Sequence, residues 1–128
     1  MLTIKTSLKE FKEKGIGLVC EEFVKKGQVV WKYLPGFDLF FDKKNIPKKL
    51  KIFFEKYAVD TGDGRYFLCG DNTRFMNHSK NPNIKSLGKG SKIAKDGVAI
   101  KNIKPGDEIT IDYESLEDVP IDFKVVEK

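Results

Sequence analysis

The chain has few of the residues that build metal centres and disulfide scaffolds. Among its 128 residues only Cys20 and Cys69 are cysteines, and His78 is the one histidine. Two cysteines that lie 49 positions apart cannot supply a cysteine-based zinc cluster, and they argue against a disulfide-stapled domain. We therefore expect two thiols in the core and no metal.

The sequence also lacks an apolar run of the roughly 18 residues that a membrane-spanning helix needs. The N-terminal stretch MLTIKTSLKE has no apolar signal core. These absences predict a protein without a membrane partner that stays in the cytoplasm, or reaches a host nucleus if it is delivered to a host. At this length we expect one domain over residues 1–128.

Arginine is scarce as well, since Arg65 and Arg74 are the only arginines among 24 basic residues. Arginine makes the commonest specific contact to bases, so direct nucleic-acid binding is not expected. The net charge of +5 is unevenly distributed, because the residues from Asp107 onward carry eight acidic and two basic side chains. The acidic residues 114–128 are either a solvated tail or an acidic rim that attracts a basic substrate.

The sequence does contain short apolar segments separated by turn residues, which are typical of a mostly β protein with a few short helices. Strands and helices do not alternate, so a doubly wound parallel sheet is not expected. One helix is expected near residues 47–58, where apolar residues recur at helical spacing on one face. These residues are Leu50, Phe53, Phe54 and Tyr57. Strands are expected at residues 2–6, 17–22, 28–34, 37–41, 65–69, 98–103 and 109–113.

Three segments carry the residues that could do chemistry. They are residues 14–18 (KGIGL), residues 74–83 (RFMNHSKNPN) and residues 106–113 (GDEITIDY). Each segment alone has an ordinary structural explanation, namely a turn, a structural histidine and a core tyrosine at a strand end. A glycine pair, however, also lets the backbone approach a ligand closely.

Together, in this order and spacing, the segments resemble the SET-domain protein lysine methyltransferases. Residues 74–83 are similar to that family's Arg-Phe-x-Asn-His-Ser-x-x-Pro-Asn signature. Residues 106–113 are similar to its Gly-Glu-Glu-Leu-x-x-Asp-Tyr signature, with Asp107 and Ile109 as substitutions. The resemblance covers about residues 4–118. It implies a SET-domain, β-clip-like fold of small sheets with a C-terminal pseudoknot, in which about residues 35–70 form an inserted helical segment.

The resemblance also implies roles for individual residues. Tyr113 would be the catalytic tyrosine, and S-adenosyl-L-methionine would be the methyl donor, with S-adenosyl-L-homocysteine as its product. For the His78 ring a hydrogen-bonded structural role is preferred to that of a general base. The residues implied for the cofactor are Gly15, Ile16, Gly17, Asn77 and His78, and those implied for the substrate channel are Ile111 and Phe75.

The implied activity is methyl transfer to a lysine in a basic protein segment such as a histone tail. The chain has no cysteine-rich zinc segment to close the channel, so Phe123 or a second copy of the chain would have to cover it. Residues of a homodimer interface would be Phe37, Leu39, Phe40 and Phe41, which could equally be core. The alternative is a catalytically silent SET-like module that binds a protein or nucleic-acid partner.

Overall fold

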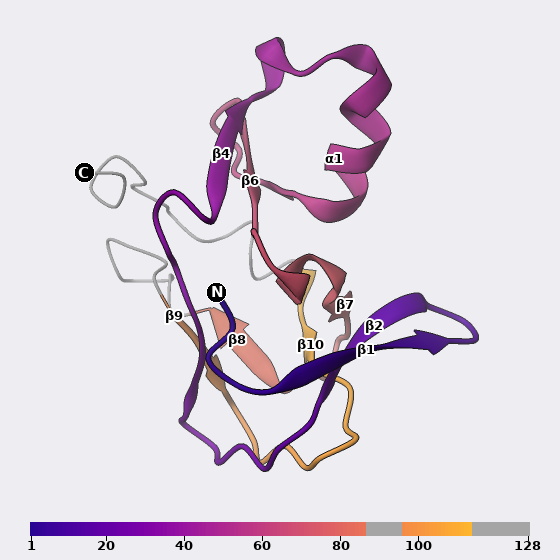
Figure 1. Ribbon diagram of the computed structural model, residues 1–128, viewed down its shortest axis with the longest axis vertical. Coiled ribbons are helices and arrows are strands. Elements are labelled where there is room, and N and C mark those ends of the chain that lie inside the picture. Colours follow the sequence, from indigo (N-terminus) through magenta and orange to yellow (C-terminus); the bar gives the residue numbers. More distant parts are fainter. Residues whose placement is uncertain (87–95, 114–128) are drawn as a thin grey trace.

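Short strands dominate the computed structural model, which describes residues 1–86 and 96–113 (Figure 1). This confirms the mostly β class with a few short helices. The helical elements are the 3-10 helices η1 (Lys43–Asn45), η2 (Lys48–Leu50) and η3 (Asn72–Phe75) and the α-helix α1 (Lys51–Tyr57). The strands are β1 (Thr6–Phe11), β2 (Gly15–Cys20), β3 (Val29–Lys32), β4 (Leu39–Asp42), β5 (Val59–Asp60), β6 (Arg65–Leu68), β7 (Asn77–His78), β8 (Ile84–Ser86), β9 (Asp96–Ala99) and β10 (Thr110–Ile111).

The described strands form three small sheets. β1 and β2 make an antiparallel hairpin, and β4, β6 and β5 make a three-stranded sheet. The five-stranded sheet has the order β3-β9-β8-β10-β7, in which β10 runs parallel to both of its neighbours. A strand late in the chain therefore lies between two earlier ones. The threading of a pseudoknot, which the resemblance implies, stays a prediction.

The three-stranded sheet is covered on both faces by aromatic side chains. Successive residues of a strand point to opposite faces. Accordingly, the ring of Phe41 packs on Phe54 of α1 with centroids 5.0 Å apart, and that of Phe40 packs on Phe67 at 4.8 Å. Tyr33, just after β3, contacts Phe40 at 6.0 Å. The sheet therefore packs with α1 on one face and with aromatic residues of the β3 region on the other.

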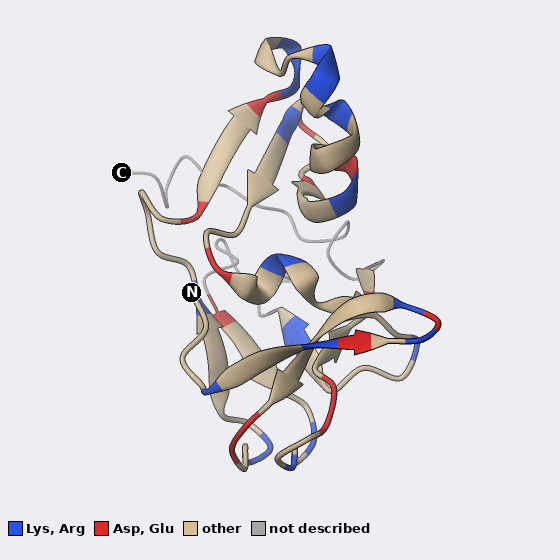
Figure 2. Cartoon of the chain, turned by 45° about the vertical axis from the view of Figure 1, so that its right-hand side comes forward, with Lys and Arg blue, Asp and Glu red and all other residues tan. Residues whose placement is uncertain are grey.

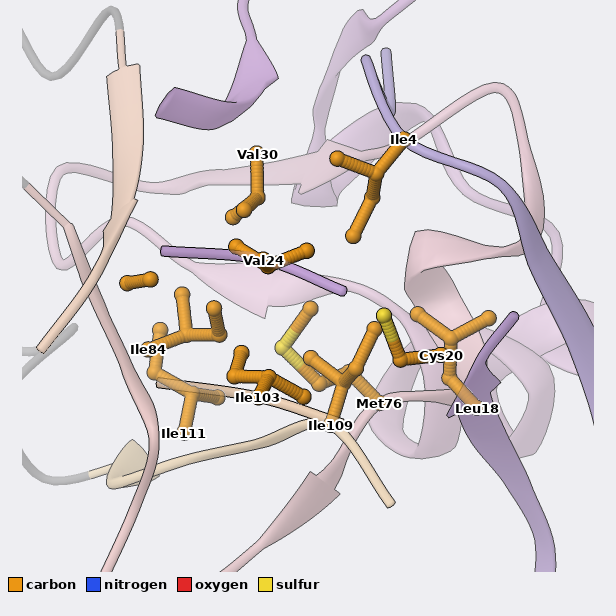
Figure 3. Packing of buried hydrophobic residues seen from close by; sticks show 11 residues of the cluster. Ile4, Leu18, Cys20, Val24, Val30, Met76, Ile84, Ile103, Ile109 and Ile111 are labelled. Atoms are coloured by element: carbon orange, nitrogen blue, oxygen red, sulfur yellow. The ribbon is translucent and has the colours of Figure 1, made fainter. Parts of the chain in front are cut away.

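The main hydrophobic core joins the hairpin to the five-stranded sheet (Figure 3). Ile109, the residue before β10, is fully buried, and Ile111, the last residue of β10, is 8% exposed. Both are therefore anchored in this core. This burial fixes the position of β10 relative to β2. Other members of the core are Ile4, Leu18, Cys20, Val24, Val30, Met76, Ile84, Ala99 and Ile103.

Several predicted elements differ from those observed; for example, the strand expected at residues 98–103 lies at Asp96–Ala99. The first strand lies at Thr6–Phe11 rather than residues 2–6, because its register is set by β2, whereas Leu2 makes one isolated bridge to Trp31. The helical segment begins as η2 after Pro47 and continues as α1. Its buried face is narrower than predicted, since Phe54 is buried while Leu50 and Phe53 are about 40% exposed.

The aromatic run that was a candidate interface divides into two parts. Phe40 and Phe41 pack within the small sheet, whereas Phe37 and Leu39 are 38% and 43% exposed. A homodimer therefore stays a prediction. In the described part of the chain, no helix is both long enough and apolar enough to cross a membrane.

Both cysteines are free thiols. Cys20 lies in the main core, and Cys69 lies at the end of the segment that contains the small sheet. Burial raises the pKa of the Cys69 thiol, and the nearby carboxylates of Asp38 and Asp71 raise it further. The thiolate, which is the reactive form, is therefore disfavoured at this position.

One buried carboxylate joins the two ends of the inserted segment. Asp38 is 1% exposed, and its carboxylate accepts the backbone N–H groups of Leu34 at 2.9 Å and Gly70 at 3.0 Å. The amino group of Met1 lies 3.2 Å from the same carboxylate. Because a buried charge must be compensated, these contacts make Asp38 a fixed point between the entry and the exit of the segment.

We predict that Asp38→Ala lowers the free energy of unfolding by on the order of 3 kcal/mol, because two backbone N–H groups lose their acceptor. Urea denaturation would measure the loss. Glu55→Ala is the control, since this exposed carboxylate lies 3.9 Å from Lys51 on the surface of α1 and its removal should change little. Equal destabilisation by both substitutions would contradict the assigned role of Asp38.

Candidate functional site

The candidate site forms where β10 pairs with β7. The two strands run parallel, and the chain then continues from β10 to Tyr113. The backbone N–H of Tyr113 donates to Nδ1 of His78 at 3.0 Å, and its hydroxyl donates to the carbonyl oxygen of Met76 at 2.5 Å. Three consecutive residues, Met76, Asn77 and His78, are thus brought beside the tyrosine predicted to be catalytic.

His78 makes a contact that orients the loop after β10. Because Nδ1 accepts the N–H of Tyr113, the proton of the neutral ring belongs on Nε2. The carboxylate of Asp112 lies 3.7 Å from Nδ1, and the rings of His78 and Tyr113 lie 5.3 Å apart. The ring therefore has a hydrogen-bonded structural contact, and the cofactor-binding role of His78 stays a prediction.

The Asn77 side chain is held by a residue that the sequence did not single out, Glu108. Its Nδ2 donates to Oε2 of Glu108 at 2.8 Å and lies 3.4 Å from the carbonyl oxygen of Ile16. The other carboxylate oxygen of Glu108 accepts from Nζ of Lys14 at 2.9 Å. A carboxylate can only accept hydrogen bonds, so the Asn77 amide must turn its NH₂ group toward Glu108. Its Oδ1 atom is thereby oriented as an acceptor on the other side.

Glycine occupies the two positions of the Gly-x-Gly segment for different structural reasons. Gly15 has a φ of 76°, which favours glycine at the tip of the hairpin. At Gly17 an added Cβ would lie 2.6 Å from Oε2 of Glu108 and 2.7 Å from Nδ2 of Asn77. The sequence argument assigned the pair to the approach of a ligand. The structure shows that a larger residue at Gly17 would displace the ends of the chain's own Glu108 and Asn77 side chains.

Asn83 fixes the start of β10 through both ends of its side-chain amide. Its Nδ2 donates to the carbonyl oxygen of Glu108 at 2.8 Å, and its Oδ1 accepts the backbone N–H of Thr110 at 2.9 Å. Asn83 is the last residue of the signature at residues 74–83, but no role was predicted for it. Its role appears only when the distant strand is in place.

The two predicted channel residues lie in different surroundings. Ile111 belongs to the main core, where its side chain is 8% exposed (Figure 3). Phe75 contacts Tyr57 of α1 with ring centroids 5.4 Å apart, and the guanidinium of Arg74 lies 5.0 Å from its ring. Phe75 therefore connects the inserted segment to the site, and the channel role of both residues stays a prediction.

Tyr113 is partly exposed and electrostatically tuned. Its side chain remains accessible, with 46% of the residue exposed. Burial of its hydroxyl group raises the pKa of Tyr113, and the negative charge of Glu108 raises it further. The hydroxyl is therefore neutral at physiological pH, and it can donate to Met76 while its oxygen accepts another hydrogen bond. Residues 114–128, which include the acidic tail and Phe123, lie outside the described residues.

The described residues do not bring three or more histidine, cysteine, aspartate or glutamate side chains together as a metal site. The polar groups at the site instead comprise an amide, a phenol, a carboxylate and an ammonium group. They belong to Asn77, Tyr113, Glu108 and Lys14. Such groups recognise a charged organic ligand by hydrogen bonds, and the expected absence of a metal stays a prediction.

We predict that Gly17→Ala breaks the hydrogen bond between Asn77 and Glu108, because the new methyl group would occupy the place of their side-chain ends. The side-chain NH₂ resonances of Asn77 in a ¹⁵N-labelled sample should shift. Gly27→Ala is the control, since a φ of 91° strains the backbone there while its added Cβ has no neighbour within 4 Å. It should lower stability by about 1 kcal/mol and leave Asn77 unchanged. An unshifted Asn77 in Gly17→Ala would contradict the assigned packing.

Comparisons with solved structures identify chains with a similar fold. A candidate histone methyltransferase of Plasmodium falciparum superposes with a TM-score of 0.61 at 22% identity, covering 88% of this chain and 95% of that one. KRYPTONITE, solved with mCHH DNA, an H3(1–15) peptide and SAH, has a TM-score of 0.61 at 21% identity, covering 88% of this chain and 24% of that one. These likenesses concern the fold.

The Neurospora SET domain protein DIM-5, a histone lysine methyltransferase, has a TM-score of 0.61 at 25% identity over 88% of this chain and 53% of that one. The chain thus spans about half of DIM-5 and about a quarter of KRYPTONITE. A search of curated proteins finds no match. The SET domain model matches residues 15–114, which include β2, the inserted segment and β10. The chain therefore belongs to the SET domain family.

Proposed function

We propose that the protein is an S-adenosyl-L-methionine-dependent protein lysine N-methyltransferase. Membership of the SET domain family supports the reaction class. The observation that carries the proposal is the contact between Tyr113 and Met76, whose carbonyl holds the tyrosine hydroxyl directly beside Asn77. A candidate catalytic hydroxyl and a candidate cofactor-binding amide are thus fixed next to each other by one strand pair.

The polar groups at the site fit the charged end of the cofactor. S-Adenosyl-L-methionine carries an ammonium, a carboxylate and a sulfonium group. Oδ1 of Asn77 and the carboxylate of Glu108 are acceptors suited to the cationic groups, whereas Lys14 has the charge that suits the carboxylate. Glu108 has a 13% exposed side chain, so its charge acts in partly desolvated surroundings.

When it is bound, the cofactor supplies a methyl group on a sulfonium, which is a good leaving group. The task of the chain's own residues is then to align the acceptor and to provide a complementary field. The acceptor lysine must be a neutral amine, although the pKa of free lysine is about 10.4. Apolar surroundings disfavour the ammonium form and therefore help to produce the neutral amine.

Tyr113 can orient that amine without stabilising its charged form. Its proton is engaged by the carbonyl of Met76, so the phenol oxygen is directed toward other groups as an acceptor. A tyrosinate at this position would hold a lysine as ammonium by charge attraction. A phenol with an ordinary pKa of about 10 is already neutral at physiological pH. Burial and then Glu108 raise the pKa of Tyr113, which moves it further from that effect.

The proposed substrate is a lysine within a basic protein segment. KRYPTONITE was solved with an H3(1–15) peptide, and DIM-5 is a histone lysine methyltransferase. Both relatives support a peptide that contains lysine as the acceptor. The product of the cofactor would be S-adenosyl-L-homocysteine.

We predict that Asn77→Ala weakens S-adenosyl-L-methionine binding at least tenfold, because an acceptor beside a cationic group is lost and Glu108 loses its partner. Isothermal titration calorimetry would measure the dissociation constant. Asn81→Ala is the matched control, since that amide accepts from Lys101 on the surface at 3.0 Å. Wild-type binding by Asn77→Ala, or no binding by the wild type, would overturn the cofactor proposal.

We predict that Tyr113→Phe lowers the rate of methyl transfer by about 100-fold or more while cofactor affinity changes little, because the hydroxyl acts on the acceptor. Transfer of a labelled methyl group to mixed histones and to a cell lysate would measure the rate. Tyr66→Phe is the control, since Tyr66 lies in the small sheet and stacks on Phe54. A Tyr113→Phe enzyme with wild-type activity would remove Tyr113 from catalysis.

A further inference from the structure

The inserted segment carries a dense group of positive charges. Residues 43–56 contain six lysines and one acidic residue, Glu55. Figure 2 shows these lysines around α1 and the turn before it, at the end of the molecule away from the five-stranded sheet. The five lysines of this segment with exposed side chains are called the lysine face: Lys44, Lys48, Lys49, Lys51 and Lys56.

Little of this charge is neutralised within the described part of the chain. Lys43 is paired with Asp60 at 2.5 Å and is therefore not counted in the lysine face. Lys51 lies 3.9 Å from Glu55, but both side chains are more than half exposed and the pair is weak. Among the described residues, no carboxylate lies within ion-pair distance of Lys44, Lys48 or Lys49.

The lysine face is held in place by packing on the opposite side of the helix. Phe54 is buried against the small sheet, and Tyr57 contacts Phe75 at 5.4 Å. From Lys48 to Lys56 the helical segment rises roughly 12 Å at about 1.5 Å per residue. Phosphates follow one another by about 3.4 Å along the axis of a duplex strand, so this array can contact several of them.

The amino-acid composition of the lysine face indicates which kind of polyanion it can bind. It contains lysine and no arginine, and lysine acts as a point charge toward phosphate rather than as a bidentate reader of bases. The helix α1 has seven residues, and its exposed apolar side chains are those of Ile52, at 78%, and Phe53, at 39%. So short an apolar surface is a poor anchor in a membrane interface.

We propose that the lysine face binds the phosphate backbone of double-stranded nucleic acid without reading its sequence. This surface is separate from the methyltransferase site, and its binding does not depend on methyl transfer. The scarcity of arginine still argues against specific base contacts. The exposed lysines change the expectation only for binding that is driven by charge.

The test compares two variants with the same change in net charge. The first is Lys44→Gln/Lys48→Gln/Lys49→Gln/Lys51→Gln in the lysine face. The control is Lys5→Gln/Lys9→Gln/Lys12→Gln/Lys25→Gln, which removes four exposed lysines near the β1–β2 hairpin and the turn after it. Fluorescence anisotropy would measure binding to a labelled 20-base-pair duplex of arbitrary sequence between about 50 and 200 mM salt.

We expect the first variant to weaken binding at least tenfold and to make the slope of log K against log salt less steep by about 3.6, since four lysines are removed and each phosphate contact contributes about 0.9. The control should change affinity less than threefold. Thermal unfolding would establish that both variants are folded. Equal weakening by the two variants, or no wild-type binding at about 50 mM salt, would overturn the proposal. Tighter binding to phosphatidylserine vesicles than to the duplex would overturn it in favour of a membrane surface.

Discussion

The arrangement of the site depends on β10 lying between β7 and β8. Parallel pairing on both edges aligns β10 with residues that precede it by about thirty positions. The alignment is reinforced by two side chains, since Asn83 bonds the start of the strand and His78 bonds the backbone after its end. With β10 in place, Asn77, Glu108 and Tyr113 fall beside one another, and Gly17 is the residue that leaves room for them.

Some residues of the site could be predicted from local sequence and others could not. Asn77, His78 and Tyr113 stood out because they occur in unusual short segments. The structure places all three together. Glu108 and Asn83 lie within the two signatures but were given no role, because a glutamate beside a turn and an asparagine after proline are common. Their importance arises from partners 25 and 31 residues away, which no local pattern specifies.

The secondary structure could be predicted where a local turn sets the start of a strand. The strand at Arg65–Leu68 follows an Asp63-Gly64 turn, and Gly64 has a φ of 89°, so the turn and the strand start were readable. The first strand was misplaced because Leu2 and Ile4 are apolar for a different reason, namely contact with the β3 region and the main core. Apolar character identifies burial, but the pairing partner decides which residues form a ladder.

The contacts of Asp38 have a consequence for how the sequence of such a domain can evolve. Asp38, near the start of the intervening segment, binds the backbone at Leu34 and at Gly70, so a single side chain closes the two ends of the segment. The entropic cost of closing a loop grows only slowly with its length. The segment between these anchors is therefore a replaceable cassette, in which length, helix content and surface charge can diverge while the strands around Tyr113 keep their register.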